Sequence, residues 1–196
     1  MIPAELQKLL DENNGTVTNK QAAKAGISRE RLRLLANVGD LERVAAGVYV
    51  SPEALPDKMY IEQTRKPQTV FSHETALFLH DLTDRDPLCY SVTVPHGYNT
   101  SALTSSGFCV FTVKRELHLL GTVQTETAFG HKIRTYNPER TICDCIRSRG
   151  KMDVAIVTDA VKRYAKRKDK NLHRLMEYAK IFRVTNPVRE YMEVLL

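Results

Sequence analysis

The stretch that decides the fold covers residues 18–50 and reads TNKQAAKAGISRERLRLLANVGDLERVAAGVYV. Its first part, 18–26, predicts a short helix with a polar start and a glycine stop. Ser28 then offers an N-cap for a second helix over 29–38, after which another glycine ends the pattern. Two short apolar runs within 41–50 predict a two-stranded ribbon. A helix, a turn, a second helix and a ribbon in this order are typical of a winged helix-turn-helix.

The second helix has an apolar side and a charged side when it is projected at about 100° per residue. Leu32, Leu35 and Val38 fall on the apolar side. The opposite side carries the residues Arg29, Glu30, Arg33 and Asn37. A solvated helix face would show the same pattern. The flanking elements favour a helix that enters the major groove, where arginine and asparagine suit guanine and adenine edges.

The predicted DNA-binding residues lie on both helices and on the ribbon. Arg29 and Arg33 are one turn apart and are expected to contact bases. Lys20, Arg43 and Tyr49 are expected to hold the phosphate backbone, a contact that positions a protein without reading sequence. The complete predicted set is Lys20, Gln21, Ser28, Arg29, Arg33, Asn37, Arg43 and Tyr49.

Two prolines within residues 51–57 break the periodicity after the ribbon and predict a linker there. We therefore expect a first domain over residues 1–52 and a second domain over residues 57–196. Leucines within residues 6–10 form an apolar stripe, which predicts an opening helix that packs on the two helices of the first domain.

The second domain alternates strand and helix patterns before it becomes helical. The elements expected in its first part are strands at 69–71, 90–94 and 109–113, a hairpin over 121–136 and a helix at 73–80. Asn137 as a cap and Pro138 at the first helical position then begin a series of helices. The expected fold class is α+β, an N-terminal winged helix-turn-helix followed by a mixed-sheet domain with C-terminal helices.

Composition and charge limit the classes of function. The 196 residues are 42% hydrophobic and 27% charged, as in ordinary globular chains, and the net charge of +6 agrees with a nucleic-acid partner. No apolar run approaches the roughly 18 residues that a membrane span needs. The N-terminal residues show no signal peptide. We therefore expect a cytoplasmic protein with no membrane partner.

Positive charge gathers in one short segment near the C-terminal end, where Asp169 is the opposing acid. The segment contains Lys162, Arg163, Lys166, Arg167, Lys168 and Lys170. It could be the solvated end of a helix, or it could contact DNA, RNA or an acidic partner. On the helix expected after Asn137, Arg140, Asp144 and Arg147 lie on successive turns and could form an intrahelical ion-pair ladder.

The four cysteines indicate neither a zinc site nor a disulfide. Cys143 and Cys145 lack the two-residue gap usual in zinc sites, and no second pair lies at a suitable distance. Cys89 and Cys109 lie in runs that resemble buried strands, where a reduced thiol behaves as a small hydrophobe. All four are expected to be reduced structural residues, and no metal site is expected.

The signs of catalysis are weak. Ser72, His73 and Glu74 form a serine–histidine–acid string, but neighbours on a helix point in different directions. A helix start with Ser72 as its cap explains them better. The chain has no Glu-x-Lys or Asp-x-Lys pair of a metal-dependent nuclease, no phosphate-binding loop and no dinucleotide-binding glycine motif. We expect no enzymatic activity and no cofactor.

Two parts of the chain resemble a known family. Residues 39–49, GDLERVAAGVY, are similar to the wing of the AbiEi family, the antitoxins of AbiE abortive-infection (type IV toxin–antitoxin) systems. Residues 71–76, FSHETA, and 92–95, VTVP, are similar to the second domain of that family. The resemblance implies an antitoxin of abortive phage infection that neutralises a nucleotidyltransferase toxin encoded beside it, without a stable complex.

The resemblance also implies a transcriptional repressor that regulates its own operon. The first domain would bind inverted repeats in the promoter, so double-stranded operator DNA is the expected physical partner. We expect a monomer in solution and two copies on the DNA, one for each repeat. The candidate residues for antitoxin activity are Ser72, His73, Glu74, Lys162, Arg163, Lys166 and Arg167.

A ligand-responsive winged-helix repressor is the alternative function. Its second domain would bind a small effector in a pocket lined by Phe71, His73 and Tyr90. The neighbouring gene distinguishes the two functions, because a nucleotidyltransferase gene would support an antitoxin and a metabolic operon would support effector sensing.

Overall fold

The computed structural model describes residues 2–195, which divide into two compact units. The first unit contains the chain up to Pro67 together with Glu126–Ile133. The second contains Gln68–Thr125 together with the residues from Arg134 onward. The first unit thus includes segments that the predicted boundaries assigned to the second domain. Which segments fold as independent domains stays a prediction.

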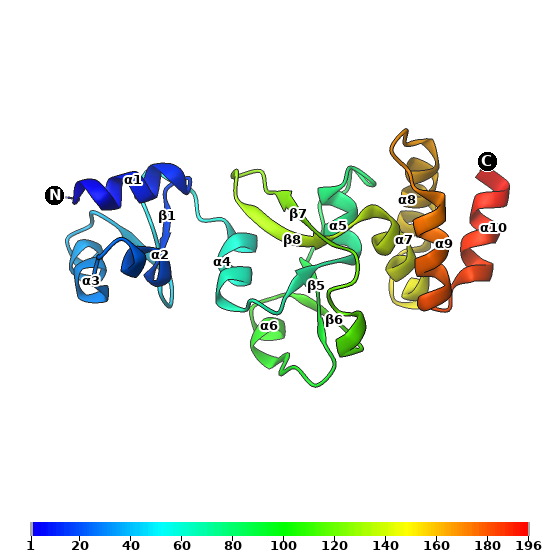
Figure 1. Ribbon diagram of the computed structural model, residues 1–196, viewed down its shortest axis with the longest axis horizontal. Helices are drawn as coiled ribbons and strands as arrows, with labels where there is room; N and C mark the ends of the chain where they lie inside the picture. Colours follow the sequence, from blue (N-terminus) through cyan, green and yellow to red (C-terminus); the bar gives the residue numbers. More distant parts are fainter. Residues whose placement is uncertain (1, 196) are drawn as a thin grey trace. The chain divides into compact units, whose positions relative to one another are not determined.

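The first unit contains helices and short strands (Figure 1). Its elements are α1 (Ala4–Glu12), β1 (Thr16–Thr18), α2 (Asn19–Lys24), α3 (Arg29–Asn37), β2 (Glu42–Ala45), β3 (Val48–Val50) and α4 (Lys58–Arg65). The strands β1, β3 and β2 form an antiparallel sheet in that order. The helical part is consistent with the predicted helix-turn-helix.

Side-chain caps explain where α2 and α3 begin. Thr18 Oγ1 accepts a hydrogen bond from the Gln21 backbone N–H, and the Gln21 side chain accepts one from the Thr18 backbone N–H. Ser28 Oγ accepts a hydrogen bond from the backbone N–H of Arg31 at 3.1 Å, which confirms the predicted cap. The turn between the two helices passes through Gly26, whose φ of +75° is left-handed and favours glycine.

The inner sides of α1, α2 and α3 form one apolar cluster with the sheet. Its buried members are Leu6, Leu10, Val17, Ala22, Ile27, Leu32, Leu35, Leu41 and Tyr49. Val38 was predicted to lie on this side, but it is 71% exposed. The prediction was wrong because α3 ends at Asn37, and Val38 is the C-cap, to which the helical projection no longer applies.

The second unit is built around a mixed sheet (Figure 1). Its strands are β4 (Val70–Phe71), β5 (Ser91–Pro95), β6 (Cys109–Val113), β7 (Thr122–Glu126) and β8 (Lys132–Tyr136). The end of β7, the loop after it and the start of β8 are assigned to the first unit. They lie in the order β6-β5-β4-β8-β7, with β4 antiparallel to β5 and parallel to β8, and with β5 parallel to β6. The predicted α+β class is confirmed.

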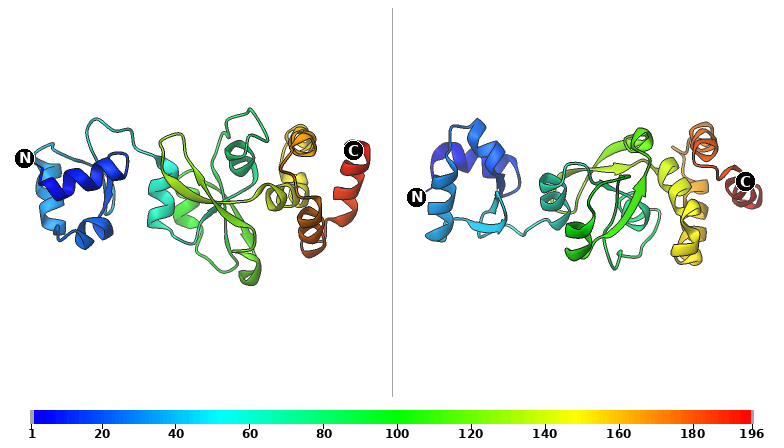
Figure 2. Two further views of the ribbon diagram at one scale, coloured as in Figure 1. Left: turned by 45° about the horizontal axis from the view of Figure 1, so that its top comes forward. Right: turned by 90° about the horizontal axis from the view of Figure 1, so that it is seen from below.

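The helices of the second unit follow the predicted order, apart from the short α6 between β5 and β6. They are α5 (His73–Leu79), α6 (Ser101–Ser105), α7 (Pro138–Arg147), α8 (Val154–Lys166), α9 (Leu172–Ile181) and α10 (Thr185–Leu195), with 3-10 turns at Arg115–Leu117 and Arg149–Lys151. Asn137 caps α7 by accepting a hydrogen bond from the Arg140 backbone N–H at 2.9 Å, as predicted. Helix α7 contacts α5, α8 and α9 (Figure 2).

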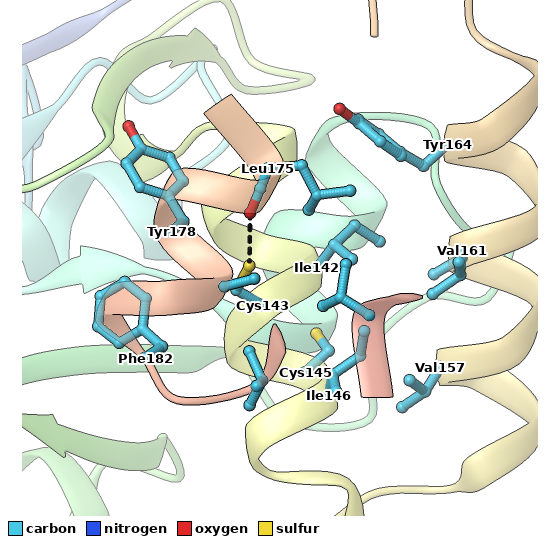
Figure 3. Close-up of a cluster of buried hydrophobic side chains, with 14 of the residues drawn as sticks. Ile142, Cys143, Cys145, Ile146, Val157, Val161, Tyr164, Leu175, Tyr178 and Phe182 are labelled. Carbon is cyan, nitrogen blue, oxygen red and sulfur yellow. Dashed lines mark hydrogen bonds between the residues drawn. The ribbon is translucent and has the colours of Figure 1, made fainter. Parts of the chain in front are cut away.

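The apolar side chains of α7 fill the core between α8 and α9 (Figure 3). Cys143 and Cys145 lie there as free buried thiols, and Cys143 Sγ donates a hydrogen bond to the carbonyl oxygen of Leu175 at 3.6 Å. Burial raises the pKa of Cys143 to about 12, and it raises the pKa of Cys145 well above its ordinary value. The prediction of reduced structural cysteines is confirmed for this pair.

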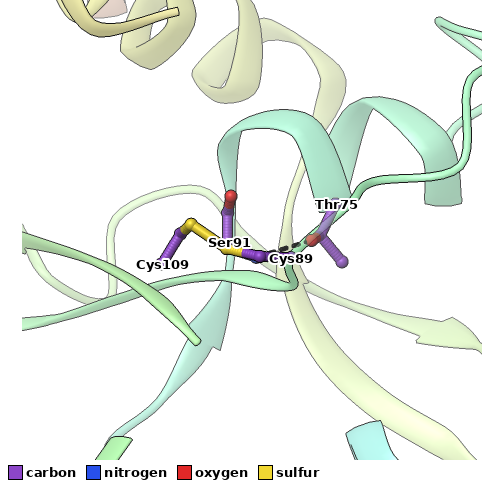
Figure 4. The surroundings of a disulfide bond; sticks show 4 residues. All are labelled: Thr75, Cys89, Ser91 and Cys109. Atoms are coloured by element: carbon purple, nitrogen blue, oxygen red, sulfur yellow. Dashed lines mark hydrogen bonds between the residues drawn. A yellow bond between two sulfur atoms is a disulfide. The ribbon is translucent and has the colours of Figure 1, made fainter. Parts of the chain in front are cut away.

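The same prediction was wrong for Cys89 and Cys109, because a disulfide joins them (Figure 4). Cys109 is exposed at the start of β6, where we had expected a buried strand. The parallel register of β5 and β6 pairs Ser91 with Cys109. This register brings Cys89, just before β5, to a Cα–Cα distance of 6.0 Å from Cys109, which a disulfide can span. The bond therefore depends on strand register, which spacing in the sequence does not show.

Reduction of the Cys89–Cys109 disulfide should destabilise the protein. The bond joins residues 20 apart, and a cross-link of this size stabilises a fold by roughly 2–4 kcal/mol, chiefly by restricting the unfolded chain. We expect the urea midpoint of the wild-type protein to fall in dithiothreitol. The C89S/C109S variant should have the same low midpoint with and without reductant. A wild-type midpoint that does not move, although alkylation shows all four thiols free, would contradict this expectation.

Asp57 holds distant segments of the first unit together. Its side chain was expected in a linker, but it is fully buried. Oδ1 accepts hydrogen bonds from two backbone N–H groups in the first turn of α4, at 3.0 and 3.1 Å. Oδ2 accepts hydrogen bonds from Thr127 Oγ1 at 2.6 Å and from His131 Nδ1 at 3.0 Å, in the loop between β7 and β8. His131 Nε2 lies 3.2 Å from the carbonyl oxygen of Asn13, just after α1.

The stability of the first unit should therefore depend on the charge of Asp57. Burial alone would raise its pKa, but hydrogen bonds from His131, Thr127 and the Tyr60 backbone, together with the charge of His131, lower the pKa of Asp57 below its ordinary value. A carboxylate with a lowered pKa in the folded state stabilises the fold above its unfolded pKa of about 3.9. This contribution is lost as the pH falls through the folded-state pKa.

Asp57→Asn should lower the free energy of unfolding by about 1–3 kcal/mol at neutral pH, because it removes the charged acceptor of a buried network. It should also flatten the loss of stability below about pH 4. Urea unfolding at a series of pH values measures both effects. Glu53→Gln changes an exposed carboxylate of the same unit and should keep the wild-type profile. An Asp57→Asn profile as steep in acid as that of the wild type would count against this assignment.

Candidate nucleic-acid interface

The outer side of α3 presents the predicted base-reading residues to solvent. Arg29, Arg33 and Asn37 are exposed, whereas Leu32 and Leu35 on the inner side are buried. Positions four apart lie one turn above each other, so the three polar residues form one row along α3. Side chains of these types can hydrogen-bond to base edges in the major groove.

The row continues into a hollow that α3 shares with β2. The hollow has a volume of about 490 Å3, and its lining includes Arg33 and Asn37 from α3 and Glu42 and Arg43 from β2. The chain turns between the two elements at Gly39, whose φ of +82° is left-handed. Residues that were predicted separately, from the helix and from the ribbon, therefore meet on one surface.

The basic side chains of this surface are available to bind phosphate. Within residues 2–195, the side chains of Arg29, Arg33 and Arg43 make no hydrogen bond or ion pair. Lys20, at the start of α2, is exposed and unpaired within the same range. Unpaired guanidinium and ammonium groups can bind a polyanion without first breaking an ion pair.

Two residues of the predicted set hold the local backbone. The Gln21 side chain accepts a hydrogen bond from the Thr18 backbone N–H at 2.9 Å and donates one to Asn13 Oδ1 at 2.7 Å. Ser28 Oγ caps α3 and is exposed. Both residues therefore position the two helices, and Ser28 keeps a hydroxyl at the surface where α3 begins.

Tyr49 does not lie on the surface of the ribbon. Its side chain is 2% exposed and belongs to the apolar cluster of the first unit. It lies on β3, the central strand of the sheet, and pairs with Val17 of β1 and Arg43 of β2. The expectation that Tyr49 contacts the DNA backbone was therefore wrong, because the tyrosine ring fills the core beneath the ribbon.

Ser72 and His73 belong to a buried polar network in the second unit. The Ser72 hydroxyl does not cap α5; it accepts a hydrogen bond from Thr93 Oγ1 at 2.8 Å and lies 3.0 Å from His73 Nδ1. His73 Nε2 lies 3.1 Å from Ser148 Oγ, and its ring stacks on Phe111. The prediction that the Ser72 side chain caps α5 was wrong. The prediction that the Ser72 and His73 side chains point in different directions was also wrong, because the two lie within hydrogen-bond distance. His73 has a φ of +49°, so helical spacing does not apply to this pair.

Within the described residues, no carboxylate hydrogen-bonds to Ser72 or His73, so the network has no acid in the position that a catalytic triad requires. Glu74 points into a separate hollow and has no hydrogen bond to His73 among the described residues. Burial lowers the pKa of His73 well below its ordinary value, and the charges of Arg147 and Arg140 act in the same direction. His73 is therefore neutral at pH 7 and is held between two serine hydroxyls.

Part of the basic segment at the end of α8 is neutralised by ion pairs. Arg163 pairs with Asp159 one turn earlier and with Asp84 from the segment after α5. Arg167 pairs with Asp169. Asp169 had been expected as the opposing acid, and the structure adds two further carboxylates.

Arg140, Asp144 and Arg147 form the predicted ion-pair ladder on α7. The Asp144 carboxylate accepts a hydrogen bond from Arg140 Nε at 2.8 Å and lies 3.0 Å from Arg147 Nη2. Arg140 is fully buried, and its guanidinium carbon lies 4.2 Å from the ring centre of Tyr136 and 3.9 Å from that of Phe182. The ladder thus begins in the core and ends at the surface with Arg147.

The side chains expected to line an effector pocket are packed into the interior. Phe71 and His73 are fully buried, and Phe71 meets Tyr90 edge to face with ring centres 6.5 Å apart. A ligand between these rings would have to displace packed side chains.

Comparison with known proteins relates the first unit to a family. Residues 5–52 match the family described as "Transcriptional regulator, AbiEi antitoxin", which confirms the resemblance over this segment. The matched residues include the α3 row and the β2–β3 ribbon. No curated protein matches the chain.

The fold is similar to that of a solved structure. The crystal structure of the RV2827C protein from Mycobacterium tuberculosis matches with a TM-score of 0.57 and 14% sequence identity, over 100% of this chain and 82% of that chain. At this identity the likeness concerns the fold alone. Within residues 2–195, no helix combines the length and the apolar character that a bilayer span requires.

Proposed function

We propose that the first unit is a winged helix-turn-helix that binds duplex DNA, with α3 in the major groove and β2–β3 as the wing. The observation that carries this proposal is the hollow in which Arg33 and Asn37 of α3 meet Arg43 of β2. The match of residues 5–52 to a family of transcriptional regulators supports it. The expected site is an inverted repeat in the promoter of the protein's own operon, with one copy on each half.

We further propose that the protein is the antitoxin of a type IV system, which neutralises a nucleotidyltransferase toxin without a stable complex. The description of the matched family, which names an antitoxin, supports this function. Lys162 and Lys166 of α8 are the strongest candidates to act on another molecule, because both are exposed and unpaired within residues 2–195. Ser72 and His73 are buried, and ion pairs hold Arg163.

Arg29→Ala combined with Arg33→Ala should abolish specific DNA binding. One bidentate contact between an arginine and a guanine contributes about 1–3 kcal/mol of discrimination. We therefore expect promoter affinity to fall at least about 100-fold in a gel-shift titration, to the level of unrelated DNA. The thermal midpoint should stay unchanged, because both side chains are exposed and unpaired.

A matched control is Lys8→Ala combined with Lys180→Ala, which removes the same charge from exposed positions on α1 and α9. It should keep most of the wild-type affinity. Wild-type binding should also weaken steeply as salt rises, because lysine and arginine release counterions from phosphates. Specific binding that survives in the α3 variant, or binding that is indifferent to salt, would rule out this DNA interface.

Lys162→Ala combined with Lys166→Ala should reduce protection against the toxin encoded by the adjacent gene. Co-expression from a promoter that the antitoxin does not regulate, with antitoxin levels checked by blotting, separates this effect from repression. The Arg29→Ala/Arg33→Ala and Lys8→Ala/Lys180→Ala variants should protect as well as the wild type. Full protection by the α8 variant would exclude these lysines, and a toxin that co-purifies with the antitoxin would exclude the type IV mechanism.

A further inference from the structure

A basic surface on the second unit has no part in the functions above. It consists of two adjoining hollows along β6, which we call the β6 hollow, with volumes of about 460 and 720 Å3. Both are lined by Thr112 of β6 and Arg147 at the end of α7. The first is also lined by Lys114 and Arg183, and the second by Lys151. Volumes of this size are typical of small-molecule sites.

The lining of the β6 hollow carries one sign of charge. Neither of its two parts includes an aspartate or glutamate. Another hollow of the same unit, of about 400 Å3, has the opposite character, since Glu74, Asp86 and Asp153 line it beside one arginine, Arg85. The cations are therefore concentrated along β6, where they create a positive potential in a concave site.

Arg147 is held in place at the centre of the β6 hollow. Its Nη2 lies 3.0 Å from Asp144 Oδ1, its guanidinium carbon lies 5.2 Å from the ring centre of Phe182, and its side chain is 30% exposed. Asp144 also pairs with the buried Arg140, so two guanidinium groups share one carboxylate. The shared carboxylate leaves one positive charge in excess, and of the three residues Arg147 is the one that lines the hollow.

The other cations of the β6 hollow are unpaired within the part of the chain that the structure describes. Within residues 2–195, the side chains of Lys114, Lys151 and Arg183 make no hydrogen bond or ion pair. Arg183 has a φ of +58°, a left-handed conformation that costs a residue with a side chain more than it costs glycine. Ser148, next to Arg147, adds a hydroxyl to the lining.

We propose that the β6 hollow binds a small anion that carries two or more phosphate groups. Arg147 would hold one phosphate from a fixed position, because Asp144 and Phe182 already orient its guanidinium. Lys114 and Arg183 on one side, and Lys151 on the other, would bind the further phosphates. Duplex DNA binding by α3 uses different residues, so the two proposals can be tested separately and the failure of one does not refute the other.

Isothermal titration of the full-length protein with sodium tripolyphosphate, at low and at physiological salt, tests the site. We expect saturable binding of one anion per chain, and weaker binding of orthophosphate and sulfate. Lys114→Ala combined with Arg183→Asn should weaken tripolyphosphate binding at least about tenfold, because it removes two charge-assisted contacts. Asparagine tolerates the left-handed backbone at position 183, so this variant should fold.

Lys162→Ala combined with Lys166→Ala removes the same charge from α8 of the same unit and should bind within about twofold of the wild type. The Arg29→Ala/Arg33→Ala variant should bind tripolyphosphate normally, which separates this site from the DNA interface. Equal weakening in the β6 and α8 variants would show non-specific attraction and overturn the proposal. So would an absence of binding, or binding of a single-stranded oligonucleotide with no binding of tripolyphosphate.

Discussion

The hydrogen-bond network of Asp57 is the constraint on which the first unit depends. One buried carboxylate caps α4 and binds Thr127 and His131 of the β7–β8 loop, and His131 reaches the carbonyl oxygen of Asn13 after α1. A buried charge is tolerated when it is paired and hydrogen-bonded, as it is here. The body that carries α3 is thus completed by a loop distant in sequence, and by the hydrogen bonds of a buried carboxylate as well as by apolar packing.

The electrostatics of the molecule depend on which cations are neutralised. The basic cluster most visible in the sequence, at the end of α8, loses part of its charge to Asp84, Asp159 and Asp169. Arg29 and Arg33 of α3 and Arg43 of β2 keep theirs, because no carboxylate pairs with these three side chains within the described residues. A net charge of +6 would not distinguish these surfaces, whereas the pattern of ion pairs does.

In the second unit, buried ion pairs contribute to the positive charge at the surface. Arg140 and Arg147 share Asp144, and the two guanidiniums also act against protonation of His73, whose pKa burial already lowers. The network from Ser72 through His73 to Ser148 is therefore uncharged at neutral pH, while Arg147 carries positive charge to the β6 hollow. The sequence does not reveal this hollow, because its cations come from separate segments and form no cluster in the chain.

The sequence by itself determined the elements whose causes are local. The predicted caps at Ser28 and Asn137 bind backbone groups three residues away, and the exposed row on α3 follows from helical spacing. The tertiary structure decided the features whose partners lie far apart: the burial of Tyr49 and the Cys89–Cys109 disulfide set by the β5–β6 register. The periodicity of the sequence does not show which residues will be partners of this kind, because the residues meet only when the folded backbone brings their segments together.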